Sequence, residues 1–443
     1  MRTVLLSLSM LCACAVCAQQ EWSLQECIDY ALAHNIQVQK NRITQEQGEV
    51  TLWQNKGALF PSLSFSTSHN VGYRPFTEVM NVVQGDQVTS TSSNVTYQGN
   101  YGLNASVTLW DGGINYKNIE QQKLQNKISA LSTEESELTI QEQIARLYVQ
   151  IMYTKEAKKV NEQLLATAKS QYERGQEMMN QGQMARADVV QLEAQYSSAQ
   201  YTVVNSQTQL DDYKRQLKAL LELDLSTPFD VTGTLPADEQ VLAVVPSAQE
   251  AYEKALDTRP EIKSAELNIE AADLKLNIAR RGYLPTIGAS AGIGSSTSTG
   301  SKSGWGQQMK TNLNMSAGLN LSMPIFDNRR NSSSVKNAKL QQMSAKLDMQ
   351  DKKQTLSSTI EQYWLNANSN QQNYLAAKTR VKSQEASYEL LNEQFQNGLK
   401  STVEVLQGRD NVMSAEQDLL QSKYTALLNI QLLKFYTGEK LDL

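Results

Sequence analysis

Few residues of the kinds that carry out catalysis occur in arrangements that could do chemistry. The two histidines, His34 and His69, have no Cys, Asp or Glu beside them at metal-ligand spacing, which disfavours zinc binding and histidine acid–base chemistry. The chain contains no glycine-rich phosphate loop and no G-x-S-x-G motif. Gly292-Ile293-Gly294 falls inside a strand pattern with no helix opening after it. The sequence therefore predicts a protein that is not an enzyme and that uses no metal or cofactor.

The cysteines cluster near the start of the chain. The four are Cys12, Cys14, Cys17 and Cys27. Arg2 and the apolar stretch that follows it are typical of an export signal, and cleavage after Ala18 leaves Cys27 as the one remaining thiol. An exported chain with one thiol has no internal disulfide, so packing or assembly must stabilise it. The alternative interpretation is a lipid-attachment site at Cys14.

The charge balance excludes one class of partner. Lys and Arg number 41, Asp and Glu number 46, and the formal net charge is -5. A protein that neutralises nucleic-acid phosphates should be basic, so we expect no nucleic-acid partner. After the export signal no stretch approaches the roughly 18 to 20 uninterrupted apolar residues that a membrane-spanning helix requires. The mature protein is therefore predicted to be either soluble outside the cytoplasm or a β-barrel.

The elements that must position any functional residue occur twice. Segments match at an offset of 224 (255 − 31) or 216 (326 − 110): residues 31–35 with 255–259, 60–63 with 284–287, Trp110 with Phe326, and Gly182 with Gly398. A duplicated unit therefore fills the mature chain. This divides the chain into an export signal (1–18), a first repeat (19–225), a linker (226–246) and a second repeat (247–443).

Proline-free spans with apolar residues at steps of three and four predict long, coiled-coil-like helices. Ile140, Ile144, Leu147 and Ile151 form one such stripe, and Leu356, Ile360, Tyr363 and Ala367 repeat it at offset 216 (356 − 140). The predicted helices cover residues 23–58, 115–178, 186–221, 248–281, 331–396 and 402–436. Their thin apolar stripes require neighbouring helices.

Four segments alternate with a period of two and predict strands. These are residues 62–73, 101–110, 286–295 and 314–325, separated within each pair by segments 74–100 and 296–310, which we expect to be surface loops. One face of each strand is apolar and the other is small and uncharged, as in strands with lipid on one side and a watery lumen on the other.

Four strands cannot span a bilayer alone, because their edges would leave backbone groups unpaired in hydrocarbon. Closure by identical copies is required, and three copies give the smallest multiple of four strands that could leave a lumen. Pro61, Pro285 and Pro324 stand where strand meets helix and are expected to fix the entries. Trp110 and Phe326 suit a membrane-interface girdle. We expect the proline-rich linker to form a belt around the helices.

The chain resembles the TolC-like outer membrane factors, also called outer membrane efflux proteins. The resemblance rests on three features: Leu24-Gln25-Glu26-Cys27-Ile28-Asp29-Tyr30-Ala31-Leu32 with Asn35, the strand entries Phe60-Pro61 and Leu284-Pro285, and the segment from Phe395 to Leu406. It implies an α plus transmembrane β fold: a homotrimer with a 12-stranded outer-membrane β-barrel and a periplasmic α-barrel. It also implies a periplasmic adaptor protein and an inner-membrane pump of the RND, ABC or MFS type.

The resemblance also assigns roles to the two helical turns. The adaptor-docking tips would be Gly182, Gln183, Met184 and Ala185, and Gly398, Leu399, Lys400 and Ser401. The periplasmic gate would use Asp188, Phe395, Lys400 and Glu404. Phe395 stands where tyrosine is usual and therefore lacks the hydroxyl of the usual gate. Carboxylates repeated by symmetry around a narrow lumen would concentrate cations.

The predicted function is an outer-membrane exit duct of a tripartite efflux system. A type I protein secretion duct is the alternative within the same fold, because the pump selects the cargo. An envelope coiled-coil structural protein is the alternative of another class, although it leaves the in-phase strands and the duplication unexplained.

Overall fold

The computed structural model describes residues 21–73, 75–76, 80–84, 87–91, 94–224, 226–233, 237–299, 301 and 303–442. The predicted export signal and Cys14 lie outside the described residues. The chain forms two compact units, which are described separately. One is helical and contains residues up to 43, 130–265 and from 349 onward; the other contains residues 44–129 and 266–348.

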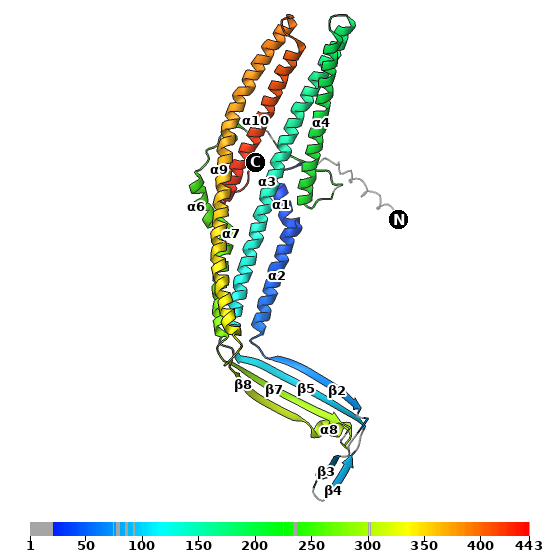
Figure 1. Cartoon of the computed structure of the whole chain (residues 1–443), viewed down its shortest axis with the longest axis vertical. Helices are drawn as coiled ribbons and strands as arrows, with labels where there is room; N and C mark the ends of the chain where they lie inside the picture. The colour runs from blue at the N-terminus through cyan, green and yellow to red at the C-terminus, as the bar shows by residue number, and fades with distance from the viewer. Residues whose placement is uncertain are drawn as a thin grey trace, which may run out of the picture. The chain divides into compact units, whose positions relative to one another are not determined.

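Long helices account for most of the chain, as the apolar spacing predicts (Figure 1). They are α1 (Leu24–His34), α2 (Ile36–Gly57), α3 (Ile114–Asn180), α4 (Arg186–Leu220), α6 (Ala248–Thr258), α7 (Pro260–Arg281), α9 (Arg330–Gln396) and α10 (Thr402–Tyr436). α3 with α4, and α9 with α10, form two antiparallel hairpins of matching length. Both repeats begin with a capping box, Ser23 with Glu26 and Ser247 with Glu250.

The prediction of single helices over 23–58 and 248–281 was wrong, because each is broken after its first eleven residues. Arg259 precedes Pro260, and the proline ring disfavours the helical conformation of the residue before it. In the first repeat Asn35 has an extended backbone with ψ 127°, and its side-chain oxygen accepts from the backbone N–H of Gln37 at 2.9 Å. The break therefore recurs at the same position of both repeats with different chemistry.

Each break is also tied to the end of the last helix of its own repeat. The Asn35 amide donates to the Leu220 carbonyl at 3.0 Å, and the Arg259 guanidinium lies 4.3 Å from the centroid of the Tyr436 ring. Pro260 marks the break in the second repeat, whereas no proline marks the break at Asn35. The anchoring contacts join residues far apart in the chain, and no local pattern reports them.

Four antiparallel strands form one sheet in the order β2-β5-β7-β8. They are β2 (Ser62–Tyr73), β5 (Val95–Trp110), β7 (Thr286–Ser298) and β8 (Asn314–Ser322). β5 and β7 extend further than the alternating pattern indicates, and β8 stops before Pro324, which has no N–H for the ladder. The central strands are paired on both sides, whereas β2 and β8 are the edges of the described sheet.

Each pair of strands is connected by one segment, and neither of the two connecting segments is a simple loop. The second contains a short helix, α8 (Trp305–Thr311), whose Met309 carbonyl accepts from the Ser295 hydroxyl at 2.9 Å. The first contains a separate hairpin of β3 (Met80–Gln84) and β4 (Gln87–Thr91). The expectation of surface loops over 74–100 and 296–310 is corrected accordingly.

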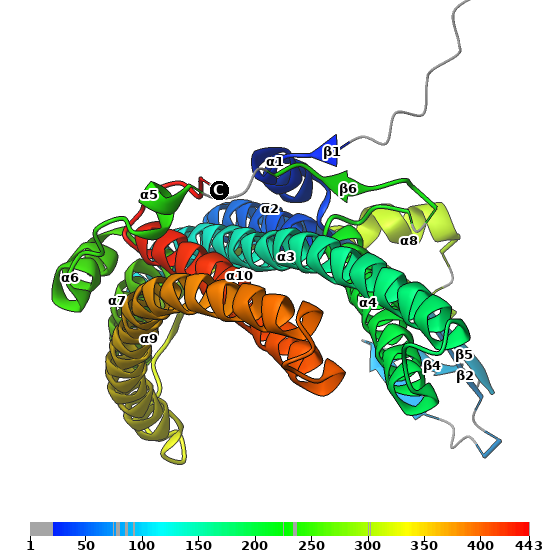
Figure 2. The ribbon, with the colours of Figure 1, turned by 90° about the horizontal axis from the view of Figure 1, so that it is seen from above.

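The core of the helical unit lies between the long helices at the predicted stripe positions. Ile144, Ile151 and Ile360 are fully buried, as are Leu217, Leu432 and Leu433. The linker adds two short elements to this unit. β6 (Asp230–Val231) pairs in parallel with β1 (Glu21–Trp22), and α5 (Asp238–Val241) packs on α10. Figure 2 shows these short elements on the outside of the long helices.

Candidate functional site

The two hairpin turns have the same backbone conformation. Gly182 and Gly398 both have φ +72°, which a side chain would strain. The Gly182 N–H donates to the Met179 carbonyl at 2.9 Å and the Gln183 N–H to the Met178 carbonyl at 2.8 Å, and the same two bonds recur at Gly398 and Leu399. This Schellman pattern ends α3 and α9 in the same way and exposes both tips.

The helices that leave these turns begin differently. Ser401 and Glu404 form a capping box, in which the Glu404 carboxylate accepts from the Ser401 N–H at 3.0 Å. The Lys400 ammonium lies 2.6 Å from the same carboxylate, and Lys400, together with Ser401, lowers the pKa of Glu404 to about 2. At the other tip the N-cap residue of α4 is Ala185, which provides no side-chain cap. The second tip is therefore fixed more firmly than the first.

Exchanging the caps should shift stability in opposite directions. Ser401→Ala should destabilise the protein and Ala185→Ser, which places a hydroxyl three residues before Asp188, should stabilise it, each by about 0.5–2 kcal/mol. Thermal denaturation of the two variants, followed by circular dichroism at one scan rate, measures the shifts. A change in melting temperature of the same sign in both variants would contradict the assignment of the caps.

The same capping box has a defined pH dependence. Because the folded-state pKa of Glu404 is depressed, its stabilising effect is present above the ordinary glutamate pKa near 4.5 and is lost as the pH falls toward 2. The penalty of Ser401→Ala should therefore be full at pH 7 and shrink below pH 4.

None of the four residues predicted for a gate forms a side-chain hydrogen bond or ion pair between the two hairpins in the described part of the chain. Glu404 and Lys400 pair with each other one helical turn apart. Asp188 and Phe395 are half-buried, and among the described residues neither has a side-chain hydrogen bond or ion pair to the other hairpin. Their assignment as gate residues stays a prediction.

A polar cluster missed by the sequence reasoning joins the hairpins close to these tips. Arg409 on α10 is buried and donates to the Gln171 side chain of α3 at 3.3 Å. Its neighbour Asp410 accepts from Gln195 of α4 at 3.0 Å and from Arg409 at 3.2 Å. We call Gln171, Gln195, Arg409 and Asp410 the cross-hairpin cluster. The sequence contains one sign of this cluster: Arg409 stands four residues after Val405, at a position of the apolar stripe of α10.

Two further polar contacts join the hairpins farther from the tips. Gln417 donates to Asn161 at 3.2 Å, and Asn161 in turn donates to Ser206 at 2.8 Å. Beyond them, the hydroxyl of Tyr363 donates to the half-buried carboxylate of Glu142 at 2.7 Å. The contacts at several levels keep the two hairpins of one chain in a fixed register.

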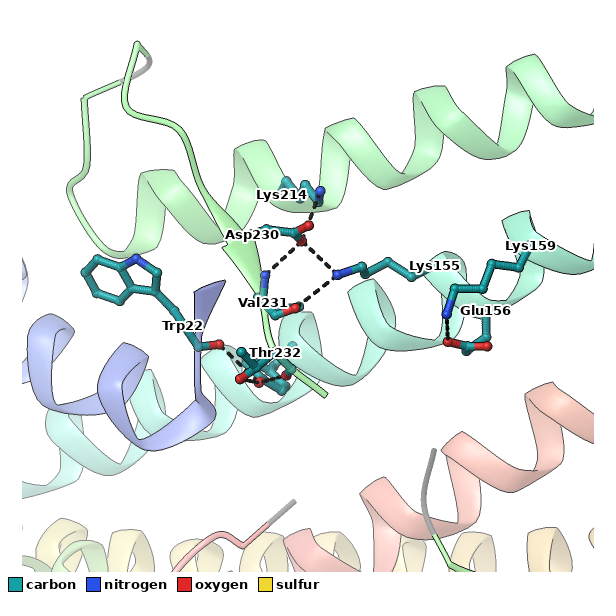
Figure 3. Close-up of polar contacts among 9 residues, drawn as sticks. Trp22, Lys155, Glu156, Lys159, Lys214, Asp230, Val231 and Thr232 are labelled. Carbon is teal, nitrogen blue, oxygen red and sulfur yellow. Dashed lines mark hydrogen bonds and ion pairs between the residues drawn. The ribbon is translucent and has the colours of Figure 1, made fainter. Parts of the chain in front are cut away.

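The linker is attached to both hairpins through two aspartates. Asp230 lies 3.1 Å from the Lys155 ammonium of α3 and 3.0 Å from that of Lys214 on α4 (Figure 3). Burial favours the protonated acid, but hydrogen bonds from the two lysines outweigh it and leave the pKa of Asp230 lowered. Figure 3 also shows the Lys155 ammonium turned toward the Val231 carbonyl, at 3.0 Å.

The second aspartate, Asp238, binds the other hairpin. It accepts from the Lys378 ammonium and from the Tyr374 hydroxyl of α9, both at 2.6 Å, and Lys378, followed by Tyr374, lowers the pKa of Asp238 to about 2. The linker therefore bridges the two hairpins within the helical unit.

The sheet has two chemically different faces. Cross-strand register places Leu63, Ala105, Ala291 and Ala317 in one row on the same face. The alternate residues, Ser62 with Ser106 among them, form a polar face without charge. Pro61 and Pro285 directly precede β2 and β7, and Pro324 follows β8; their role in fixing the strand entries stays a prediction. Among the described residues, none of the helices has the length and apolar character of a membrane-spanning segment.

Long paired helices, matched tip turns and a two-faced sheet define a subunit of an outer-membrane channel. A family model described as "Outer membrane efflux protein" matches residues 27–222 and 251–439. The chain therefore belongs to the outer membrane efflux protein family, and it has the TolC-like fold that the resemblance implies. It is an outer-membrane duct rather than an enzyme.

Individual relatives are distant in sequence but similar along most of the chain. The outer membrane efflux protein BepC of Brucella suis biovar 1 (strain 1330) is 21% identical over 83% of this chain and 77% of its own length. The alkaline protease secretion protein AprF of Pseudomonas aeruginosa (strain PAO1) is 22% identical over 61% of this chain and 55% of its own. The crystal structure of CusC superposes with a TM-score of 0.78 at 18% identity, covering 94% of this chain and 92% of CusC.

Proposed function

We propose that three copies of this chain form a passive exit duct for small toxic compounds, the outer-membrane part of a tripartite efflux system. The observation that carries the proposal is the open sheet, in which β2 and β8 are edges and one face is apolar. In hydrocarbon these edges must be paired by further copies. β8 of one copy and β2 of the next would run antiparallel, as neighbours in the sheet already do.

The helices carry a second sign of missing neighbours. Ile36, Ile43 and Val50 are exposed on α2 at heptad spacing, and Leu340 and Leu347 are exposed on α9 at the same spacing. Such stripes are seams for neighbouring helices. Closing the sheet would bring α2 of one copy toward α9 of the next, which would cover both seams.

Three copies suit a duct better than two. With four strands per copy, two copies give an eight-stranded barrel, whose interior side chains fill, and three give twelve strands. The family resemblance points to the same number. In this arrangement the α-barrel of long helices extends into the periplasm.

The tips would receive the periplasmic adaptor. Leu399 is exposed beside the glycine turn, and Val403 and Val190 are exposed on the helices that follow the two turns. An adaptor that presents apolar side chains would cover them. The pump behind the adaptor would be of the RND, ABC or MFS type.

The closed state would be held near the tips by the cross-hairpin cluster. Asp188 and Glu404 would line the lumen between this cluster and the tips. Replacing Arg409 by Ala removes the donor to Gln171 and one partner of Asp410. We expect a severalfold rise in single-channel conductance of the purified protein in planar bilayers. Arg380→Ala is the matched control, because Arg380 pairs with Asp418 inside one hairpin at 2.5 Å. Equal conductance of both variants would contradict this lock.

Cargo is tested in a deletion strain. Intracellular accumulation of dyes, antibiotics and bile salts is measured while secreted proteins are quantified. Increased accumulation with unchanged secretion supports efflux. Loss of a secreted protein with unchanged accumulation supports the second candidate, a type I secretion duct, which the similarity to AprF favours.

A further inference from the structure

One face of the sheet carries no charge and no bulky side chain. Every even-numbered residue in 62–72, 96–108, 286–298 and 314–322 is Ser, Thr, Asn, Gln or Gly. None of the four strands contains Asp, Glu, Lys or Arg on either face. Under the proposed function this polar face lines the passage, because the large apolar side chains, Leu63, Phe65 and Leu319 among them, stand on the opposite face and meet lipid.

The polar side chains of this face bond to one another across the strands. The hydroxyls of Ser62 and Ser106 are 2.9 Å apart, the Asn100 amide donates to the Ser68 hydroxyl at 3.3 Å, and the Thr96 hydroxyl donates to the Gly72 carbonyl at 3.3 Å. These short side chains therefore lie along the sheet and reach little into the space before it. At Gly318 a Cβ atom would meet nothing within 4 Å, so the wall is open at this point.

Two carboxylates next to the strands are used in local structure. At the end of β5 the Asp111 carboxylate accepts from the backbone N–H of Gly113 at 2.9 Å and of Asn115 at 2.8 Å. After β8 the Asp327 carboxylate accepts from the Asn331 N–H at 2.8 Å. Both aspartates cap the start of a long helix, where the helix dipole favours a negative charge. They do not stand on the strand wall.

We propose that the strand-lined part of the duct is an electrically neutral passage that does not select solutes by the sign of their charge. The inference rests on the proposed function. Pores select by charge through fixed charged groups near the permeating solute, and a group farther away than a Debye length of about 10 Å at 0.1 M salt acts weakly. Hydroxyl and amide groups can face a cation or an anion. Anionic, cationic and neutral solutes would all pass this segment, and any charge selection would arise elsewhere along the duct.

The local potential can be measured with thiol reagents of opposite charge. Gly318→Cys places a thiol on the polar face, and Leu319→Cys places one on the apolar face of the same strand. The native Cys27 is buried, and Cys12, Cys14 and Cys17 lie in the predicted export signal. The full chain in outer-membrane vesicles is treated with cationic and anionic methanethiosulfonates, and the two rate constants are compared with those for a free small thiol.

The ratio of cationic to anionic rate constants at Gly318→Cys should equal that of the free thiol within about twofold, since no fixed charge lies nearby. Ser290 is the cross-strand partner of Gly318, so Ser290→Asp and Ser290→Lys provide the calibration. They should change the ratio by about fivefold in opposite directions. A ratio in the Gly318→Cys variant that departs tenfold from the free thiol would overturn the proposal.

The same variants separate failure of this proposal from failure of the proposed function. Leu319→Cys should react far more slowly than Gly318→Cys in membranes, because it faces lipid. If Leu319→Cys reacts as fast or faster, the polar face does not line a passage and the duct itself is refuted. Ser316→Cys and Asn320→Cys, on the same face as Gly318, repeat the measurement if one variant does not assemble.

Discussion

Replacing Ala317 by Lys is expected to remove most of the assembled protein from the outer membrane. Ala317 lies on the apolar face in the row of Leu63, Ala105 and Ala291, between Met315 and Leu319 on its own strand. A lysine facing lipid near the bilayer midplane costs about 2–4 kcal/mol. The cost recurs in every copy that closes the sheet, so three copies together lose roughly three times that amount.

The neighbouring Ser316→Lys is the matched control. It introduces the same side chain one position earlier, on the opposite face of β8, where water in the lumen would solvate the ammonium. Both variants are expressed equally, and the outer-membrane fraction is examined for oligomers that resist dissociation in unheated detergent gels. Loss in Ser316→Lys alone would show that the two faces have been assigned the wrong way round, and loss in both variants would contradict a water-filled lumen on the Ser316 face.

The alternation that supports this experiment was readable from the sequence. Strand positions near Ser62 and Thr286 follow from a period of two bounded by proline, and the long helices follow from apolar steps of three and four over spans without proline. Both signals are local, and both occur twice, at an offset of 216 or 224 residues. Repetition separates them from chance patterns, because a random alternation would not recur in phase 216 to 224 residues later.

The contacts that join distant helices could not be predicted in the same way. Glu404 and Lys400 attracted attention as charges near a tip, yet Glu404 forms the capping box of its own helix with Ser401, and Lys400 pairs with Glu404. Arg409 and Asp410 join the hairpins through glutamines of α3 and α4. A glutamine carries no charge and is common on helix surfaces, so its partner becomes evident only when the register of two helices is known. Helix register between hairpins depends on packing across more than 200 residues of sequence, as for Gln171 and Arg409.

The packing inside the hairpins contains a reciprocal exchange of large and small residues. In the first hairpin Gly175 of α3 lies against Leu192 of α4, where an added Cβ would come within 2.6 Å of the leucine. At the equivalent positions of the second hairpin, offset by 216 (391 − 175), Leu391 of α9 lies against Gly408 of α10, with a corresponding distance of 2.7 Å. Each pair holds one leucine and one glycine, on opposite helices. The helices can therefore approach closely only if the total volume of the pair is kept.

Exchanging the second pair should show strong coupling between its members. Gly408→Leu overfills the contact and is expected to cost about 1–3 kcal/mol. Leu391→Gly removes a packed side chain and lowers helix propensity, at about 2–5 kcal/mol. The double variant reproduces the arrangement of the first hairpin. Its loss of stability should therefore be smaller than the sum of the two single losses by at least about 1 kcal/mol. The four proteins of this cycle are compared by thermal denaturation of the helical signal at one scan rate.

Leu390→Gly supplies the control for the backbone effect of glycine. Leu390 is exposed on the same turn of α9, so its replacement should cost about 1 kcal/mol from helix propensity alone. Combined with Gly408→Leu, it should give an additive loss, because the two residues do not share the contact. If Leu391→Gly and Gly408→Leu were also additive, the glycine would not be a packing requirement of the hairpin. Coupling between Leu391 and Gly408, without coupling between Leu390 and Gly408, would show that each hairpin needs one leucine and one glycine at this contact. The leucine lies on the second helix of the first hairpin and on the first helix of the second hairpin.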